Sequence, residues 1–134
     1  MTRQEILADI TTTLGLVPEW IASMPDHVLE HEWSILKTVQ LGESVIPNKY
    51  KELMGLGVAA VIQCPYCIHF HTEAARLWGA TEEEIQEALM MAKLTAGWST
   101  YISGTQYDVQ KFKQETASIV RHVKRGMKGK AKAA

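Results

Sequence analysis

The chain has 134 residues, a length that suits one compact domain whose core needs neither disulfides nor a structural metal. Lysine and arginine number 14 against 15 aspartates and glutamates, so the formal net charge of −1 gives no reason to expect binding to nucleic acid or to an anionic membrane. Apolar residues make up 46% and charged residues 22%, as in ordinary globular proteins.

The most apolar stretch, residues 53–62, has about half of the roughly 20 residues that a membrane-spanning helix needs, and therefore indicates a buried helix. Acidic residues near the N-terminus interrupt the apolar core that a signal peptide would require. We therefore expect a cytoplasmic protein in a reducing environment. There, the spacing of the only two cysteines, Cys64 and Cys67, favours redox or metal chemistry over a structural disulfide.

Apolar residues in the first part of the chain recur at helical intervals, without the alternation typical of strands. A first helix is predicted over residues 2–14, with Thr2 as its N-cap and Gly15 ending it. A short helical turn follows at 18–25. A longer helix is predicted over 26–42. Residues at helical spacing form a stripe along it: Leu29, Trp33, Leu36 and Gln40, with Ile35 and Val39 beside them.

The middle of the chain predicts three more helices, over residues 47–63, 64–79 and 81–104. Thr81 and Glu84 form a capping-box pattern at the start of the third, with three glutamates at the favourable end of the helix dipole. Beyond its first turns, this helix is apolar on most faces. That pattern indicates a subunit interface in so small a protein.

A last helix is predicted over residues 105–124, and the basic residues 125–134 are expected to form a disordered, solvated tail. The sequence therefore predicts an all-α protein of about six helices, with a single domain over 1–124. The four tryptophans and six methionines are assigned to the core or to interfaces, and Trp78 and Trp98 are the candidates for lining a pocket.

Residues 63–71, QCPYCIHFH, contain both cysteines and two of the five histidines. At about 100° per residue on a helix, Cys64, Cys67 and His71 fall within about 60° of one another. His69 lies more than about 100° from Cys67. His71 is therefore the candidate partner of the thiols, and His69 is expected to be a surface or interface residue.

Both cysteines have a physical reason to be reactive. Cys64 lies at a helix start, where unpaired backbone N–H groups and the helix dipole stabilise a thiolate. Cys67 has His71 one turn later, able to take its proton. CPYC is also the active-site sequence of glutaredoxins, but there a strand leads into the motif. The segment KELMGLGVAAVIQ before it is predicted here to be helical, which excludes that fold.

Glu52 lies on the helix that precedes the cysteines. The next residues on its face are small or apolar, so another helix could approach closely and bury the carboxylate, which would suit a proton relay. By itself, Glu52 would be interpreted as a solvated charge. The face consists of Gly55, Leu56, Ala59 and Ala60.

Together, Glu52, Cys64, Cys67 and His71 reproduce the E-x11-CxxC-x3-H pattern of alkylhydroperoxidase D-like proteins in the carboxymuconolactone decarboxylase family. The similarity extends over 47–104 and includes HTEAARLWGATEEEIQEAL. This resemblance implies a helical fold, a homotrimer or homohexamer, and a cysteine peroxidase that reduces hydroperoxides and is re-reduced by a dithiol or a partner protein. Neither a cofactor nor a metal is expected.

The resemblance also implies roles. Cys67 would be the peroxidatic cysteine, Cys64 the resolving and more accessible one, and Glu52 with His71 the relay that deprotonates Cys67. The helix dipole alone would favour Cys64 as the nucleophile. Some family members have a histidine between the cysteines where this chain has Tyr66. A phenol is a poor base near neutral pH, so proton transfer at Tyr66 would run through water or more slowly.

Three alternatives remain beside the peroxidase. A lyase acting on a small lactone would need no cysteine pair. A zinc module is disfavoured because four ligands from one short helix cannot surround a tetrahedral ion. In a non-catalytic assembly protein the cysteines would merely pack as small hydrophobic residues.

Overall fold

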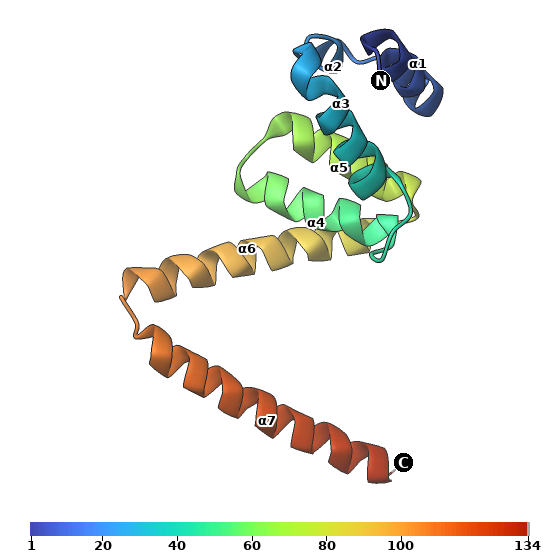
Figure 1. Ribbon diagram of the computed structural model, residues 1–134. Coiled ribbons are helices and arrows are strands. Elements are labelled where there is room, and N and C mark those ends of the chain that lie inside the picture. Colours follow the sequence, from blue (N-terminus) through green and yellow to red (C-terminus); the bar gives the residue numbers. More distant parts are fainter. Residues whose placement is uncertain (134) are drawn as a thin grey trace. The chain divides into compact units, whose positions relative to one another are not determined.

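The chain is all-α in a computed structural model that describes residues 1–133, and those residues contain no strand (Figure 1). This confirms the fold class expected from the sequence. Two compact units are distinguished, Met1–Ala92 and Lys93–Ala134. Their boundary falls inside one continuous helix, α6 (Glu82–Gly104), so the single domain over 1–124 stays a prediction.

The first unit opens with α1 (Arg3–Leu14), which begins and ends as predicted. The Thr2 hydroxyl accepts a hydrogen bond from the Glu5 N–H at 3.3 Å, and the Glu5 carboxylate accepts one from the Thr2 N–H at 2.7 Å. This reciprocal capping box satisfies two backbone donors at the helix start. Gly15 then takes a left-handed φ of 83°, which a residue without a Cβ adopts at low cost.

The next helices are α2 (Glu19–Ala22) and α3 (Asp26–Ile35), and α3 continues directly into the π-helix η1 (Leu36–Leu41). The predicted helix over 26–42 is thus present, but its last turns are wider than an α-helix. The Gly42 N–H donates to the Lys37 carbonyl at 2.8 Å, the five-residue spacing of a π-helix. Leu36, Gln40 and Leu41 of this wide turn border the candidate site described below.

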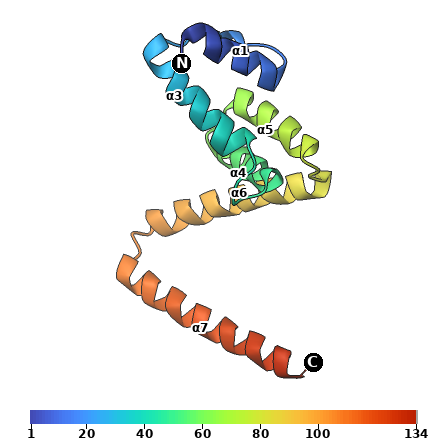
Figure 2. The same cartoon turned by 45° about the vertical axis from the view of Figure 1, so that its right-hand side comes forward.

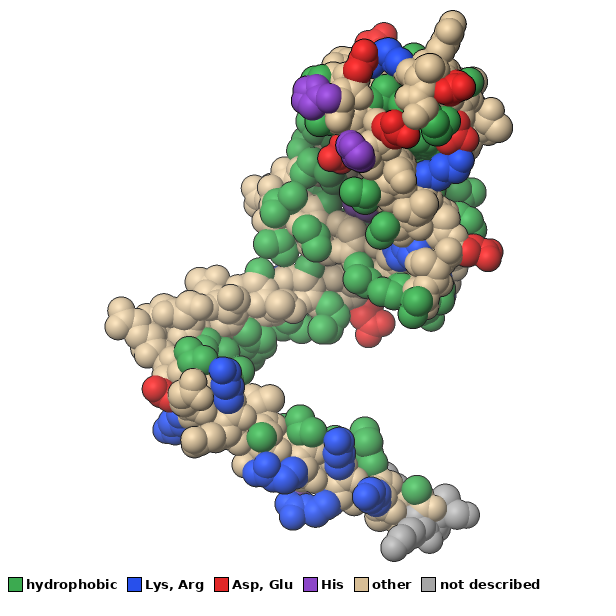
Figure 3. Space-filling view, in the orientation of Figure 1, with side chains coloured by type: hydrophobic (Ala, Val, Ile, Leu, Met, Phe, Trp, Pro, Cys, Tyr) green, Lys and Arg blue, Asp and Glu red, His purple; other side chains and the backbone are tan. Residues whose placement is uncertain are grey.

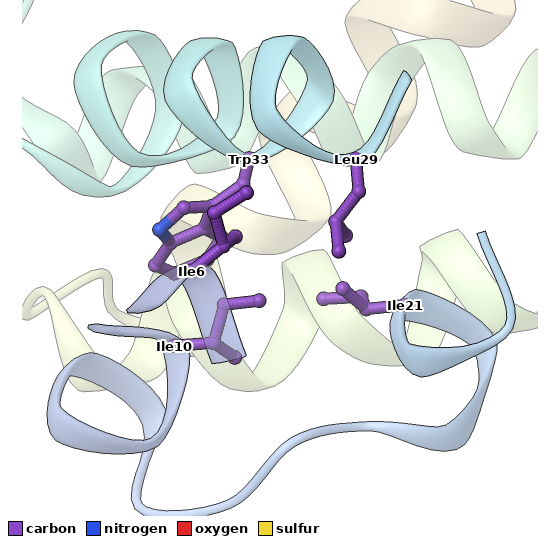
Figure 4. Close-up of a cluster of buried hydrophobic side chains, with 5 residues drawn as sticks. All are labelled: Ile6, Ile10, Ile21, Leu29 and Trp33. Atoms are coloured by element: carbon purple, nitrogen blue, oxygen red, sulfur yellow. The ribbon is translucent and has the colours of Figure 1, made fainter. Parts of the chain in front are cut away.

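One hydrophobic core joins these N-terminal helices. Figure 4 shows its side chains pointing toward one another from α1, α2 and α3. The Trp33 ring, only 5% exposed, also donates its Nε1–H to Asp9 Oδ2 at 2.7 Å, and Lys37 Nζ lies 2.7 Å from Asp9 Oδ1. The core consists of Ile6, Ile10, Ile21, Leu29 and Trp33.

A second core lies between α4 (Asn48–Val61), α5 (Pro65–Leu77) and the first turns of α6. Helices α4 and α5 run side by side in both views (Figures 1 and 2). The core residues are Leu56, Ala75 and Ile85. Helix α4 ends slightly before the predicted residue 63, because Gln63 takes a φ of 55° in the turn that leads into α5.

The capping box predicted at the start of α6 is present. The Glu84 N–H donates to the Thr81 hydroxyl at 3.1 Å, and the Thr81 N–H donates to the Glu84 carboxylate at 2.9 Å. The same carboxylate pairs with Lys49 Nζ at 2.9 Å. Glu84 therefore both caps α6 and links it to α4.

The second unit comprises the rest of α6 and α7 (Val109–Ala133). Asp108 opens α7 by accepting the Lys111 N–H at 2.6 Å. Residues 125–133 are helical, so the expected disordered tail is wrong for that stretch, and Ala134 lies outside the described residues. The stretch is rich in lysine, alanine and other strong helix formers, which outweigh about 1 kcal/mol lost at each glycine.

Helix α7 carries basic side chains along one side and hydrophobic ones along another (Figure 3). Large hydrophobic side chains of α6 are also exposed in the single chain, among them Met90, Leu94 and Trp98. The subunit interface expected from the apolar character of α6 stays a prediction. Over the part of the chain that the structure describes, no helix is both long and apolar enough to cross a membrane.

The N-terminal core should be sensitive to the loss of Leu29, which is 0% exposed. Leu29→Ala should lower the free energy of unfolding by about 2–5 kcal/mol, because a buried leucine loses both its transfer energy and its packing. Leu77→Ala removes the same atoms from a side chain that is 79% exposed and serves as the control. Denaturant unfolding measures both, and equal losses would contradict the assignment of Leu29 to the core.

Candidate active site

The turn between α4 and α5 places the cysteine pair. After Gln63, Cys64 is the N-cap of α5 and Pro65 occupies the first turn of the helix, where its missing N–H costs nothing. The Cys64 sulfur accepts a hydrogen bond from the Cys67 N–H at 3.3 Å. A thiol therefore takes the place that serine or aspartate usually occupies at a helix start. The two thiols are free.

The two thiols differ in acidity. A hydrogen bond from the Cys67 thiol, followed by the Cys67 backbone N–H, lowers the pKa of Cys64 below its ordinary value. The same interaction with Cys64, reinforced by burial, raises the pKa of Cys67. When the pair loses its first proton, the thiolate therefore forms preferentially at Cys64 while Cys67 keeps its proton.

Glu52 and His71 face each other across α4 and α5. His71 Nδ1 lies 2.6 Å from Glu52 Oε2. The Glu52 side chain is 1% exposed and that of His71 is 17% exposed. The interpretation of Glu52 as a solvated charge is therefore wrong, and the close helix approach predicted from its small neighbours is present.

Gly55 makes this approach possible. A Cβ built on Gly55 would lie 2.6 Å from His71 Nδ1 and 2.7 Å from His71 Nε2, well inside contact distance. The imidazole ring therefore lies directly against the backbone of α4. Leu56 and Ala59, which follow Glu52 on the same helix, are also buried, with 1% and 3% of their surfaces exposed.

This geometry assigns the ring nitrogens of a neutral His71. With Glu52 ionised, Nδ1–H donates to the carboxylate and Nε2 keeps its lone pair. A carboxylate that holds a histidine in this way also stabilises the imidazolium formed when Nε2 takes a proton. Glu52 and His71 can therefore act together as a base without Glu52 being reached by solvent.

A cavity of about 640 Å³ opens beside this pair. Cys67 and His71 both line it, and neither Cys64 nor Glu52 is among its lining residues. From the chain around the cysteines the lining also includes Pro65, Tyr66, His69 and Phe70, and from the N-terminal helices Leu14, Pro18, Trp20, Ile21, Leu36, Gln40 and Leu41. The lining is thus mostly apolar around two groups that can exchange a proton.

Two features of this cavity differ from the expectations based on sequence. His69 lines it, although its angular position pointed away from Cys67, because the cavity borders a broad part of the exposed surface of α5. The tryptophan in its wall is Trp20, and Trp78 and Trp98 are not among the lining residues. Helical spacing describes one helix at a time and therefore could not show which tryptophan of another helix lies opposite the cysteines.

Tyr66 also lines the cavity, with 84% of its surface exposed. Its place between the cysteines thus puts a phenol at the solvent side of the cavity. Among the described residues, no group of three or more histidine, cysteine, aspartate or glutamate side chains is arranged to hold a metal ion.

The model of the carboxymuconolactone decarboxylase family matches residues 23–107, which include the cysteines, Glu52 and His71. The chain belongs to this family. Family membership confirms the resemblance drawn from the four-residue pattern. The matched residues include α4 and α5, the elements that supply those four residues.

Individual relatives agree with the family assignment. The chain is similar to the crystal structure of the alkylhydroperoxidase AhpD core from Rhodospirillum rubrum, with a TM-score of 0.69 and 29% identity over 79% of this chain and 81% of that one. An alkyl hydroperoxide reductase of Mycobacterium tuberculosis is 32% identical over 58% of this chain and 23% of its own length. Uncharacterized protein 4 in the cox locus of Paracoccus denitrificans is 40% identical over 42% of this chain and 51% of its own length. The chain thus matches about half of one curated relative and about a quarter of the other.

The contact of His71 with Gly55 predicts a sharp difference between two glycines of α4. Gly55→Ala should force the imidazole away from Glu52 and lower the free energy of unfolding by about 1–3 kcal/mol. Gly57→Ala is the matched control, since its Cβ would meet Ala92 at an ordinary 3.6 Å. The imidazole proton shared with Glu52 should vanish from the NMR spectrum of Gly55→Ala and persist in Gly57→Ala. Its persistence in both would contradict the packing described.

The acidity of the thiols predicts opposite shifts in two variants. Cys67→Ala removes the largest cause of the lowered pKa of Cys64, so that pKa should rise. Cys64→Ala removes the cause that raises the pKa of Cys67, so that pKa should fall. The pH dependence of iodoacetamide alkylation, followed by mass spectrometry, measures each remaining thiol. A Cys64 pKa that does not rise in Cys67→Ala, or a Cys67 pKa that does not fall in Cys64→Ala, relative to the same thiol in the parent protein, would contradict this interaction.

Proposed function

We propose that this protein is a thiol-dependent hydroperoxidase in which Cys67 attacks the peroxide and Cys64 resolves the product. The observation that carries the proposal is that Cys67 and His71 open into one cavity while His71 is held from behind by buried Glu52. Similarity to alkylhydroperoxidase and alkyl hydroperoxide reductase proteins supports the same chemistry.

The first step is the activation of Cys67. Its thiol proton passes to His71 Nε2, directly or through water, and the imidazolium is stabilised by Glu52 at Nδ1. This base is needed because the pKa of Cys67 is raised by Cys64 and by burial. The Glu52–His71 pair thus compensates for the lower acidity of the thiol that faces the cavity.

The second step is oxygen transfer. The Cys67 thiolate attacks the distal oxygen of ROOH and the O–O bond breaks. An S–O bond forms, and the alkoxide leaves with the proton held by His71. Cys67 is then a sulfenic acid and the organic product is the alcohol ROH. The imidazole is again neutral and ready for the next cycle.

In the third step Cys64 reacts as a thiolate, which the Cys67 backbone N–H still stabilises after the Cys67 thiol has been oxidised. The thiolate attacks the Cys67 sulfur, a disulfide forms and the hydroxyl group leaves as water after protonation. The sum is two thiols and one hydroperoxide converted to a disulfide, an alcohol and water. In this cycle the acidity of Cys64 serves the resolving role, and its position away from the cavity keeps it from competing with Cys67 for peroxide.

The cycle closes when a dithiol or a partner protein reduces the disulfide by thiol exchange. Each step uses side chains of this chain, so the proposal includes no cofactor. We further propose that the protein acts in the cytoplasm, where such reductants are present, and assembles as a homotrimer or homohexamer through the exposed apolar faces of α6 and α7.

The family name also suggests a lyase acting on a lactone. Such a reaction would use Glu52 and His71 as acid and base and would leave the cysteines without a role. The lowered pKa of Cys64 and its contact with Cys67 are the observations that favour the peroxidase.

The proposal is tested by hydroperoxide consumption with dithiothreitol as the reductant. Cys67→Ser should abolish turnover. With the reductant omitted, Cys64→Ser should consume about one equivalent of peroxide and leave a Cys67 sulfenic acid in place of the disulfide. Glu52→Gln should lower the rate by about 10²-fold, because His71 loses the charge that stabilises its protonated form. Exposed Glu43→Gln is the control and should match the parent protein. Equal rates in the parent and the three site variants would refute the proposal.

A further inference from the structure

The cavity beside Cys67 has one wall that the family match does not cover. The family model begins at residue 23. Leu14, Pro18, Trp20 and Ile21 precede that point, yet all four line the cavity opposite the cysteines. The reacting groups therefore come from the part shared with the family, and the facing wall comes from α1, α2 and the turn between them.

This wall is built into the fold. Ile21, 2% exposed, anchors α2 in the N-terminal core. The Arg3 guanidinium donates to the carbonyl of Met24 at 3.1 Å and to the carbonyl of Ala22, and it pairs with Asp26 at 2.5 Å. The residues that directly follow Trp20 are thereby fixed against α1 and α3.

Trp20 occupies a distinctive position in the wall. The residue is 62% exposed, and it borders both the main cavity and a second one of about 120 Å³. Met24, Trp33 and Leu36 line this smaller cavity. Trp20 therefore contributes to the walls of two cavities, and one of them is the cavity that Cys67 lines.

Hydrogen peroxide is small and polar and has no apolar group that could be buried against this wall. A hydroperoxide with an apolar carbon group would bury that group against the indole while its O–O bond lies at Cys67. The volume of about 640 Å³ lies in the range of about 300–1,000 Å³ typical of small-molecule sites. Burial of apolar surface would then favour organic peroxides by the usual hydrophobic contribution.

We propose that Trp20, supported by Leu14 and Pro18, is the specificity-determining residue that selects hydroperoxides with a bulky apolar group over hydrogen peroxide. This inference rests on the proposed function. The redox step is the one given above, with Cys67 oxidised and the hydroperoxide reduced to its alcohol. Trp20 touches the organic group and takes no part in proton transfer.

The kinetic test compares cumene hydroperoxide with hydrogen peroxide for the parent, Trp20→Ala and the control Trp78→Ala, whose side chain is outside the cavity. Trp20→Ala should lower kcat/KM for cumene hydroperoxide about tenfold through lost apolar contact and leave that for hydrogen peroxide within about twofold. Trp78→Ala should leave the ratio of the two unchanged. An equal fall for both peroxides in Trp20→Ala, or no change for either, would overturn the role of Trp20.

A binding test separates this inference from the proposed function. Equilibrium dialysis of cumyl alcohol, the reaction product, measures occupancy of the cavity without catalysis, in Cys67→Ser and in that variant combined with Trp20→Ala or Trp78→Ala. Only the Trp20→Ala combination should bind about tenfold more weakly. If the parent protein does not reduce peroxide but this difference in binding is found, the peroxidase proposal fails while the role of Trp20 in binding the apolar group is supported. Equal binding of cumyl alcohol by all three proteins would contradict the role of Trp20 in binding the apolar group.

A further variant guards against a folding defect in Trp20→Ala. Leu14→Gln changes the same wall from α1, at a side chain that is 36% exposed, and leaves α2 intact. It should also weaken cumyl alcohol binding while its thermal unfolding matches that of the parent. Unchanged binding in a folded Leu14→Gln protein would overturn the supporting role of α1.

Discussion

The contact on which the candidate site depends is the one between a buried carboxylate and an imidazole. An ionised carboxylate removed from water is costly unless it is paired and hydrogen-bonded. His71 pairs with Glu52 only because Gly55 lets the ring lie against the backbone of α4. The packing of α4 against α5 and the use of Nδ1 as the hydrogen-bond donor, which leaves Nε2 its lone pair, are thus two consequences of one contact. A change that separates these helices would remove the base and leave a buried charge without its partner.

Two different parts of the chain complete the site around this pair. The turn at Gln63 places Cys64 at the start of α5, where its sulfur accepts a backbone hydrogen bond. The N-terminal core holds α2 and η1 opposite α5, which turns an exposed helix surface into a cavity. Reactivity therefore depends on local structure at one helix start. Access to it depends on packing between helices that are distant in the sequence.

This division explains how much the sequence could predict. Thr2, Gly15, Thr81 and Glu84 marked helix ends correctly because capping is local chemistry. The small residues on one face of α4 predicted the close helix approach that buries Glu52, whereas its pairing with His71 was implied only by the family resemblance. Trp20 and His69 were not recognised, since whether a residue borders a cavity depends on the opposite wall. The disorder predicted for residues 125–133 was wrong, because this basic segment also consists largely of residues that favour a helix.

The difference in acidity between the cysteines bears on the order of events in the proposed cycle. A thiol with a lower pKa forms its thiolate at lower pH, but that thiolate is intrinsically a weaker nucleophile. Cys64, with its lowered pKa, is the thiol of the pair that loses its proton more readily. Cys67, with its raised pKa, becomes the stronger nucleophile once His71 has taken its proton. Helix-dipole reasoning identifies the more acidic thiol, whereas the cavity and the base identify the sulfur that meets the peroxide in the proposed cycle, and the two need not be the same atom.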